Sequence, residues 1–108
     1  MNLLLDENLP VKLTSYFTVS HQVSTVVREG WSGVKNGKLI KLMSDRGFDV
    51  LITIDKNIGY QQKYETLAIK IVVQNAVDNK ISTLEPYVKE AELLLSKETS
   101  EKLLVVDV

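Results

Sequence analysis

Two apolar stretches of the chain end in the same arrangement of polar residues. Residues 3–8 read LLLDEN and residues 52–57 read ITIDKN, so each apolar run is followed by an aspartate, one further residue and an asparagine. Carboxylates that converge repel each other, and they either raise one pKa or bind a cation. Asp6 and Asp55 are therefore the first candidates for a chemical site. Aspartate and asparagine are also ordinary turn and helix-cap residues, so a purely structural role stays open.

Five apolar runs predict the strands that would position these residues. Strands are expected at residues 2–5, 22–27, 49–54, 68–73 and 102–107. Most of these runs are continuously apolar and are separated by helical patterns, which is typical of a parallel sheet covered on both faces. With 108 residues, the chain is predicted to be a single α/β domain spanning residues 1–108.

The segments between the strands predict the helices. A helix capped by Asn8 is expected after the first strand, and another is expected at about residues 38–46. Ser82 and Glu85 have the spacing of a capping box, which predicts the start of a helix that runs to about residue 96. Residues 55–66 are read as a loop with a short helix, in which residues 60–62 either line the site or begin that helix.

Acidic residues follow the expected strands at their carboxyl ends, where open α/β sheets bind ligands. Asp6 and Glu7 follow the first strand, Glu29 the second and Asp55 the third, while Asp78 follows the fourth less closely. If the strands that precede Asp6 and Asp55 are neighbours, these two carboxylates converge. Glu29 and Asp78 taken singly are more typical of solvated loop acids.

The available ligand atoms indicate which cation such a cluster would bind. The chain has no cysteine and one histidine, and an oxygen-only cluster favours Mg²⁺ or Mn²⁺. Such an ion polarises a phosphoryl oxygen and activates water, which is the chemistry of phosphodiester hydrolysis. The single histidine, His21, is expected at the amino end of the second strand and is read as structural or exposed.

Composition narrows the classes of partner. Lys and Arg number 13 against 14 Asp and Glu, a formal charge of -1, so contact with RNA would need a local basic patch. No apolar run approaches the length of a membrane span and no signal peptide is recognised, so a cytoplasmic protein without membrane contact is expected.

Three blocks of the sequence together resemble a bacterial family of PIN-like domains. These blocks are LLLDENLP at residues 3–10, GWSGVKNGKL at residues 30–39 and FDVLITIDKNIGYQQ at residues 48–62. The resemblance spans nearly the whole chain and implies a three-layer α/β/α sandwich with a central parallel sheet. It extends more distantly to PIN-domain ribonucleases, including toxins of toxin–antitoxin pairs, which hold Mg²⁺ or Mn²⁺ at a cluster of acids and cleave RNA. Asp6 and Asp55 match the acids that follow the first and third strands of that pattern.

Two acids of the PIN pattern have no clear counterpart here. The second acid usually comes from the helix after the glycine-rich loop, where this chain has Asn36, a glycine and Lys38. For the fourth acid, Asp78 is the one candidate. Glu7 and Glu29 are the candidate substitutes, either completing the metal shell or orienting water, and Asn36 would contact a metal-bound water or a phosphate. The departure removes one ligand and adds a positive charge.

Three functional hypotheses follow. The first is a metal-dependent ribonuclease, in one form the toxin partner of an antitoxin protein, and the PIN resemblance also suggests a homodimer. The second is an inactive PIN-like module that binds RNA or a protein partner without cleavage, and Lys38 is its main support. The third is a phosphoreceiver domain. It needs a hydroxyl group after the fourth strand and a lysine after the fifth, and residues 74–76 and 107–108 supply neither.

The last predicted strand, at residues 102–107, is expected at an edge of the sheet. We expect it either to run antiparallel to its neighbour or to form a dimer contact, because an unpaired edge invites association.

Overall fold

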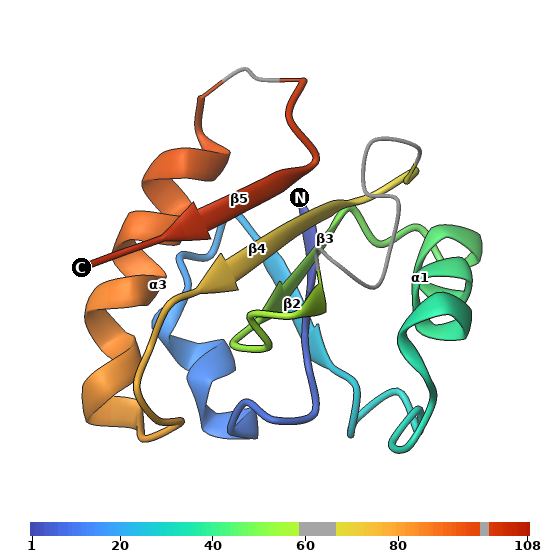
Figure 1. Ribbon diagram of the computed structural model, residues 1–108, viewed down its shortest axis with the longest axis horizontal. Helices are drawn as coiled ribbons and strands as arrows, with labels where there is room; N and C mark the ends of the chain where they lie inside the picture. Colours follow the sequence, from blue (N-terminus) through green and yellow to red (C-terminus); the bar gives the residue numbers. More distant parts are fainter. Residues whose placement is uncertain (59–66, 98–99) are drawn as a thin grey trace.

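Four of the five strands are short and mostly apolar, which suits a sheet that is buried on both faces, whereas the strand at residues 22–25 reads QVST. The computed structural model describes residues 1–58, 67–97 and 100–108 (Figure 1). Its elements are β1 (Asn2–Leu5), the 3-10 helix η1 (Val11–Tyr16), β2 (Gln22–Thr25), α1 (Asn36–Asp45), β3 (Val50–Thr53), β4 (Lys70–Gln74), α3 (Ile81–Leu95) and β5 (Leu103–Val106). All four residues of β3 are buried, as are three of the four in β1.

The sheet is parallel throughout, with the strand order β2-β1-β3-β4-β5. The prediction of an α/β fold with a mainly parallel sheet is therefore confirmed. β5 pairs with β4 in parallel, with Leu103 opposite Ile71, so the antiparallel alternative for this strand was wrong. The carboxyl ends of all five strands consequently lie along one edge of the sheet.

Each face of the sheet carries its own apolar core. On one face, Leu13 of η1 and Leu84 and Val88 of α3 pack with residues of the sheet such as Leu5. On the other face, the buried side chains of α1 pack with Trp31 and with strand residues such as Leu51. The arrangement, with helices on both faces, is compatible with the expected α/β/α sandwich (Figure 1). The Trp31 ring meets the Phe48 ring edge-on at 5.9 Å between centroids, so Trp31 is a core residue.

The expected helix caps were wrong. η1 begins after Pro10, not Asn8, and its N-cap makes no side-chain hydrogen bond. α3 begins at Ile81, which places Ser82 inside its first turn, where it does not act as the cap. Instead, the carboxylate of Asp78 accepts the Lys80 backbone N–H at 3.0 Å just before the helix.

Further expectations concern the end of α1, the segment after β3 and the absence of a membrane span. α1 ends before Gly47, as predicted, and Gly47 has a positive φ of 79°. Most of the segment expected to hold a short helix, residues 55–66, lies outside the described residues, and residues 60–62 lie outside them entirely. Within the described part of the chain, no helix has both the length and the apolar character needed to cross a bilayer.

Candidate functional site

Asp6 and Asp55 follow two strands that are direct neighbours in the sheet. β1 pairs with β3, with Leu5 opposite Ile52, and the backbone N–H of Asp6 donates to the Ile52 carbonyl at 2.9 Å. From β1 the chain adds β2 on one side and β3 to β5 on the other, so the strand order reverses between β1 and β3. Open α/β sheets bind ligands at such a reversal, outside the carboxyl ends of the strands. The two aspartates thus lie at the position that the topology favours.

Thr53 connects the two aspartates. Its hydroxyl group donates a hydrogen bond of 2.7 Å to Asp6 Oδ2 and accepts the backbone N–H of Asp55 at 3.0 Å. The Thr53 side chain is fully buried at the end of β3, so its position is fixed by the sheet. Sequence reasoning missed this residue. The available signal was a hydroxyl side chain two positions before an aspartate, in an otherwise apolar strand.

The environment of Asp6 disfavours its charge. Burial raises the pKa of the Asp6 carboxyl above its ordinary value of 3.8, and the negative charges of Asp55 and Glu7 raise it further. The hydrogen bonds from the Thr53 hydroxyl and the Glu7 backbone N–H act in the opposite direction without cancelling the effect. A nearby cation would favour the charged form of Asp6 and would offset both the cost of its burial and its repulsion by Asp55.

The asparagines that follow these aspartates have different environments. Asp55 Oδ1 accepts the backbone N–H of Asn57 at 3.0 Å, so Asn57 closes a turn and its side chain is exposed. The Asn8 carbonyl accepts a hydrogen bond from the Asn79 side chain, which links the loops after β1 and β4. The Asn8 side-chain oxygen is buried without a hydrogen-bond partner in the described part of the structure.

The remaining acids of the predicted set are held by other parts of the fold. Glu7 Oε1 accepts the Gly33 backbone N–H at 3.1 Å, which ties the loop after β1 to the glycine-rich loop before α1. Glu29 Oε2 accepts the Ser24 hydroxyl at 2.7 Å and thus lies against β2. Asn36 is the first residue of α1, whose first turn carries no acid.

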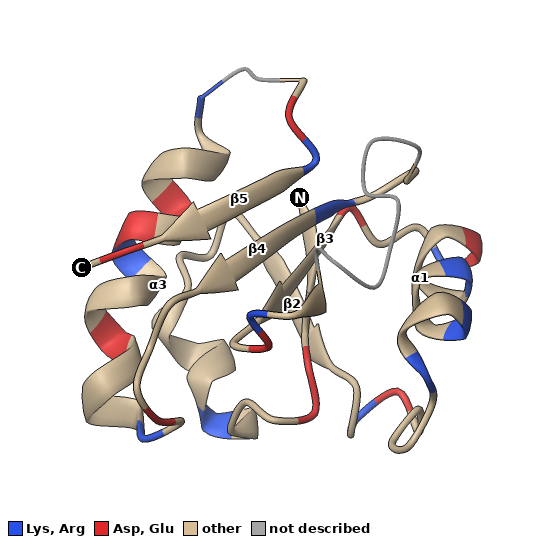
Figure 2. Ribbon diagram, in the orientation of Figure 1, with Lys and Arg blue, Asp and Glu red and all other residues tan. Residues whose placement is uncertain are grey.

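Asp78 belongs to the loop before α3. Hydrogen bonds from the Lys80 backbone N–H and from the Thr83 side chain lower the pKa of Asp78. Figure 2 shows that acidic residues occur on the loops after β1, β3 and β4. Of these loops, the first two provide the Asp6 and Asp55 pair, whereas the third uses its acid to begin a helix.

The donor set limits which cation would fit. Among the described residues, no three His, Cys, Asp or Glu side chains form a group that could hold a metal ion. Mg²⁺ is often bound through only one or two protein carboxylates and keeps several of its waters. The Asp6 and Asp55 pair fits a hard divalent cation of that kind.

No family model, curated protein or solved structure matches this chain. The geometry of the Asp6 and Asp55 pair and the resemblance of the quoted sequence blocks are therefore the observations that bear on function.

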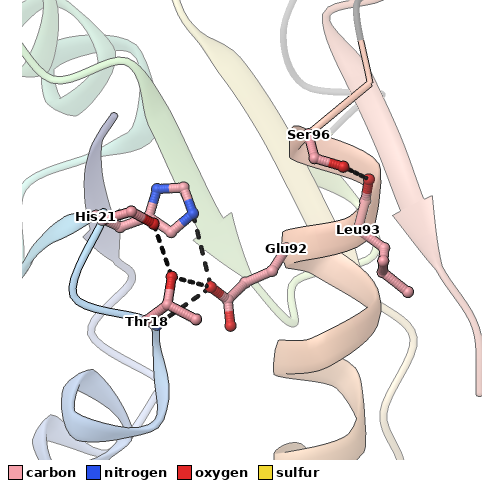
Figure 3. Close-up of polar contacts among 6 residues, drawn as sticks. Thr18, His21, Glu92, Leu93 and Ser96 are labelled. Atoms are coloured by element: carbon pink, nitrogen blue, oxygen red, sulfur yellow. Dashed lines mark hydrogen bonds and ion pairs between the residues drawn. The ribbon is translucent and has the colours of Figure 1, made fainter.

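His21 lies away from this pair, as the sequence predicted for a structural histidine. Figure 3 shows its ring beside the carboxylate of Glu92 on α3, with His21 Nε2 3.6 Å from Glu92 Oε2. The same oxygen accepts the Thr18 hydroxyl at 2.8 Å. These contacts join the segment before β2 to α3.

One further polar side chain stands out at the carboxyl edge. Gln74, the last residue of β4, is fully buried, and neither its amide nitrogen nor its amide oxygen has a hydrogen-bond partner in the described structure. Leaving such groups unpaired is costly. The sequence suggested no role for this residue.

Proposed function

We propose that the chain is a metal-dependent ribonuclease of the PIN-like type, with Asp6 and Asp55 as ligands of Mg²⁺ or Mn²⁺. The observation that carries the proposal is the pairing of these carboxylates across neighbouring strands, with the Thr53 hydroxyl hydrogen-bonded to both residues. The resemblance of the three sequence blocks supports the same conclusion.

Each residue of the candidate site has a defined task in this proposal. Thr53 orients the Asp6 carboxylate, and the fixed ends of β1 and β3 set its separation from Asp55. When bound, a divalent ion would polarise a phosphoryl oxygen of the RNA and activate a water molecule. Because no third acid of the described residues groups with this pair, Glu7 or Glu29 would act by orienting that water, and Asn36 at the start of α1 would contact phosphate or metal-bound water.

The wider context of the proposal comes from the same resemblance. The chain would act in the cytoplasm, in one form as a toxin restrained by an antitoxin protein, and would pair as a homodimer. The cytoplasmic location, the antitoxin and the homodimer are independent of the proposed metal site, since both carboxylates of the pair come from one chain.

Cleavage of a labelled RNA with Mn²⁺, compared with a chelator control, tests the proposal. Wild-type protein should cleave with Mn²⁺, and both Asp6→Asn and Asp55→Asn should lose at least a hundredfold of that rate, because each removes an anionic metal ligand. Asp45→Asn is the matched control, because Asp45 is an exposed residue on α1 that pairs with Lys41. Cleavage that persists in the chelator, or in both variants, would contradict the metal role.

A second candidate is a PIN-like module that binds RNA or protein without cleaving. The placement of Glu7 and Glu29 favours it, because each is already hydrogen-bonded within the fold. Lys38, near the start of α1, also occupies the region where the related pattern has an acid. RNA binding that is unchanged by the chelator and is weakened by Lys38→Gln would support this candidate over the nuclease.

A further inference from the structure

β2 forms one edge of the sheet and has β1 as its partner in the described structure. The Gln22 and Val26 backbone N–H groups donate to the carbonyls of Met1 and Leu5, so these residues face β1. Because successive residues of a strand alternate in direction, the N–H and C=O of Val23 point outward from the sheet. The Thr25 N–H points the same way but is covered, since Thr25 is only 1% exposed and its carbonyl accepts the Glu29 N–H. The outer edge of β2 therefore offers one donor and one acceptor to another strand, both at Val23.

A hollow lies beside this edge on each face of the sheet. One, of about 220 Å³, is lined by Asn2, Gln22, Val23, Ser24, Arg46 and Phe48. The other, of about 330 Å³, includes Phe17, His21, Val23 and Arg28 in its lining. Phe48 packs against the core on the α1 side and Phe17 belongs to the core on the α3 side, so the hollows open on opposite faces. Val23 lines both.

The two hollows contain the only arginines of the chain, Arg46 in one and Arg28 in the other. In the described part of the structure, neither guanidinium group has a hydrogen-bond or ion-pair partner. The nearby acids are engaged elsewhere, because Glu29 accepts the Ser24 hydroxyl and Glu92 contacts Thr18 and His21 (Figure 3). Arginine binds carboxylates through a rigid, bidentate geometry.

We propose that the β2 edge binds an extended, acidic segment of a partner protein as an added strand. Neighbouring side chains of a strand point to opposite faces, so two consecutive acidic residues place one carboxylate in each hollow. Main-chain hydrogen bonds to Val23 supply affinity, and the arginines supply specificity. The edge strands of a second copy, β2 (QVST) and β5 (LLVV), carry no acid, so pairing of either strand with the β2 edge does not meet that requirement. The inference is independent of the proposed nuclease site.

A synthetic peptide with the sequence Thr-Val-Glu-Glu-Val-Thr, acetylated and amidated at its ends, tests the proposal against the same peptide with two Gln. Binding is followed by fluorescence anisotropy and by backbone amide shifts of labelled protein. We expect the Glu peptide to shift the amide of Val23 and to slow its hydrogen exchange. Arg28→Gln and Arg46→Gln should each weaken binding about tenfold through the loss of a charge-assisted hydrogen bond. Lys89→Gln, an equal change of charge on α3, should leave binding unchanged.

A pair of proline variants tests the strand geometry. Val23→Pro removes the outward N–H of β2 and should abolish binding, whereas Val105→Pro makes the equivalent change on the opposite edge strand and should not. If thermal denaturation shows that Val23→Pro is not folded, the arginine variants test the proposal instead. Equal binding of the two peptides, or shifts confined to other strands, would overturn the proposal. So would dimerisation through β2 without peptide, or displacement of the peptide from these amides by a single-stranded RNA oligonucleotide.

Discussion

The hydroxyl group of Thr53 lies 2.7 Å from Asp6 Oδ2 and also accepts the backbone N–H of Asp55. A residue of β3 thereby fixes the carboxylate that follows β1. The site is built by two strands that are far apart in sequence, and its geometry depends on their pairing in the sheet.

Thr53→Val should destabilise the protein by about 1–3 kcal/mol, because it leaves Asp6 Oδ2 and the Asp55 N–H without a buried partner at nearly unchanged volume. It should also raise the pKa of Asp6, since the Thr53 hydrogen bond lowers it. Urea denaturation measures the first effect and a carboxyl NMR titration the second. Thr53→Ser keeps the hydroxyl group, so it should change both the stability and the pKa of Asp6 less. Equal losses of stability in the two variants would assign the effect to packing.

The raised pKa of Asp6 predicts how stability depends on pH. The folded state binds a proton at Asp6 more tightly than the unfolded state does, so this contribution to stability is fully present below 3.8 and is lost as pH rises through the folded pKa. Asp6→Asn should remove that downward slope in denaturation measured across this range. Asp78, whose pKa is lowered, should show the opposite sign, contributing stability above 3.8 that is lost as pH falls. An unchanged pH profile in Asp6→Asn would contradict the assignment.

Gln74→Met should stabilise the protein by about 1 kcal/mol or more, because it replaces a buried amide that has no partner among the described residues with an apolar side chain of similar length. Equilibrium unfolding in urea measures the change. Met at the exposed Gln22 of β2 serves as the control and should alter stability little. A loss of stability in Gln74→Met would mean that the amide is satisfied in solution.

Two glycines form a matched pair for a test of backbone conformation. Gly47 has a positive φ of 79°, and a Cβ added there would meet nothing within 4 Å. Gly47→Ala should therefore cost about 1 kcal/mol through backbone strain alone. Gly37 lies in α1 without a positive φ and with the same open space, so Gly37→Ala should instead stabilise by up to about 1 kcal/mol. In thermal unfolding, Gly47→Ala should lower the melting temperature and Gly37→Ala should raise it.

β1, β3 and β4 could be predicted because their apolar runs reflect burial on both faces. All five strands were found within two residues of their expected limits. The caps were harder to predict. Asn8 and Ser82 both had suitable side chains, but the chain turned at Pro10 and Lys80, where backbone geometry and the Asp78 carboxylate determined the start of each helix.

The candidate site was predictable in part. Acids at strand ends are visible in a sequence, whereas the pairing of β1 with β3 is a long-range property. Thr53 resembled an ordinary strand residue because its role depends on that pairing. The hydrogen bonds of Glu7 to Gly33 and of Glu29 to Ser24 depend equally on how the loops fold back, so the sequence did not reveal them.

Binding of Mn²⁺ to the folded protein, measured by isothermal titration calorimetry, tests the central claim most directly. The wild type should bind the ion, Asp6→Asn and Asp55→Asn should each lose at least tenfold in affinity, and Asp45→Asn should bind as the wild type does. No binding by the wild type, or equal binding by all four proteins, would contradict a metal site at the ends of β1 and β3.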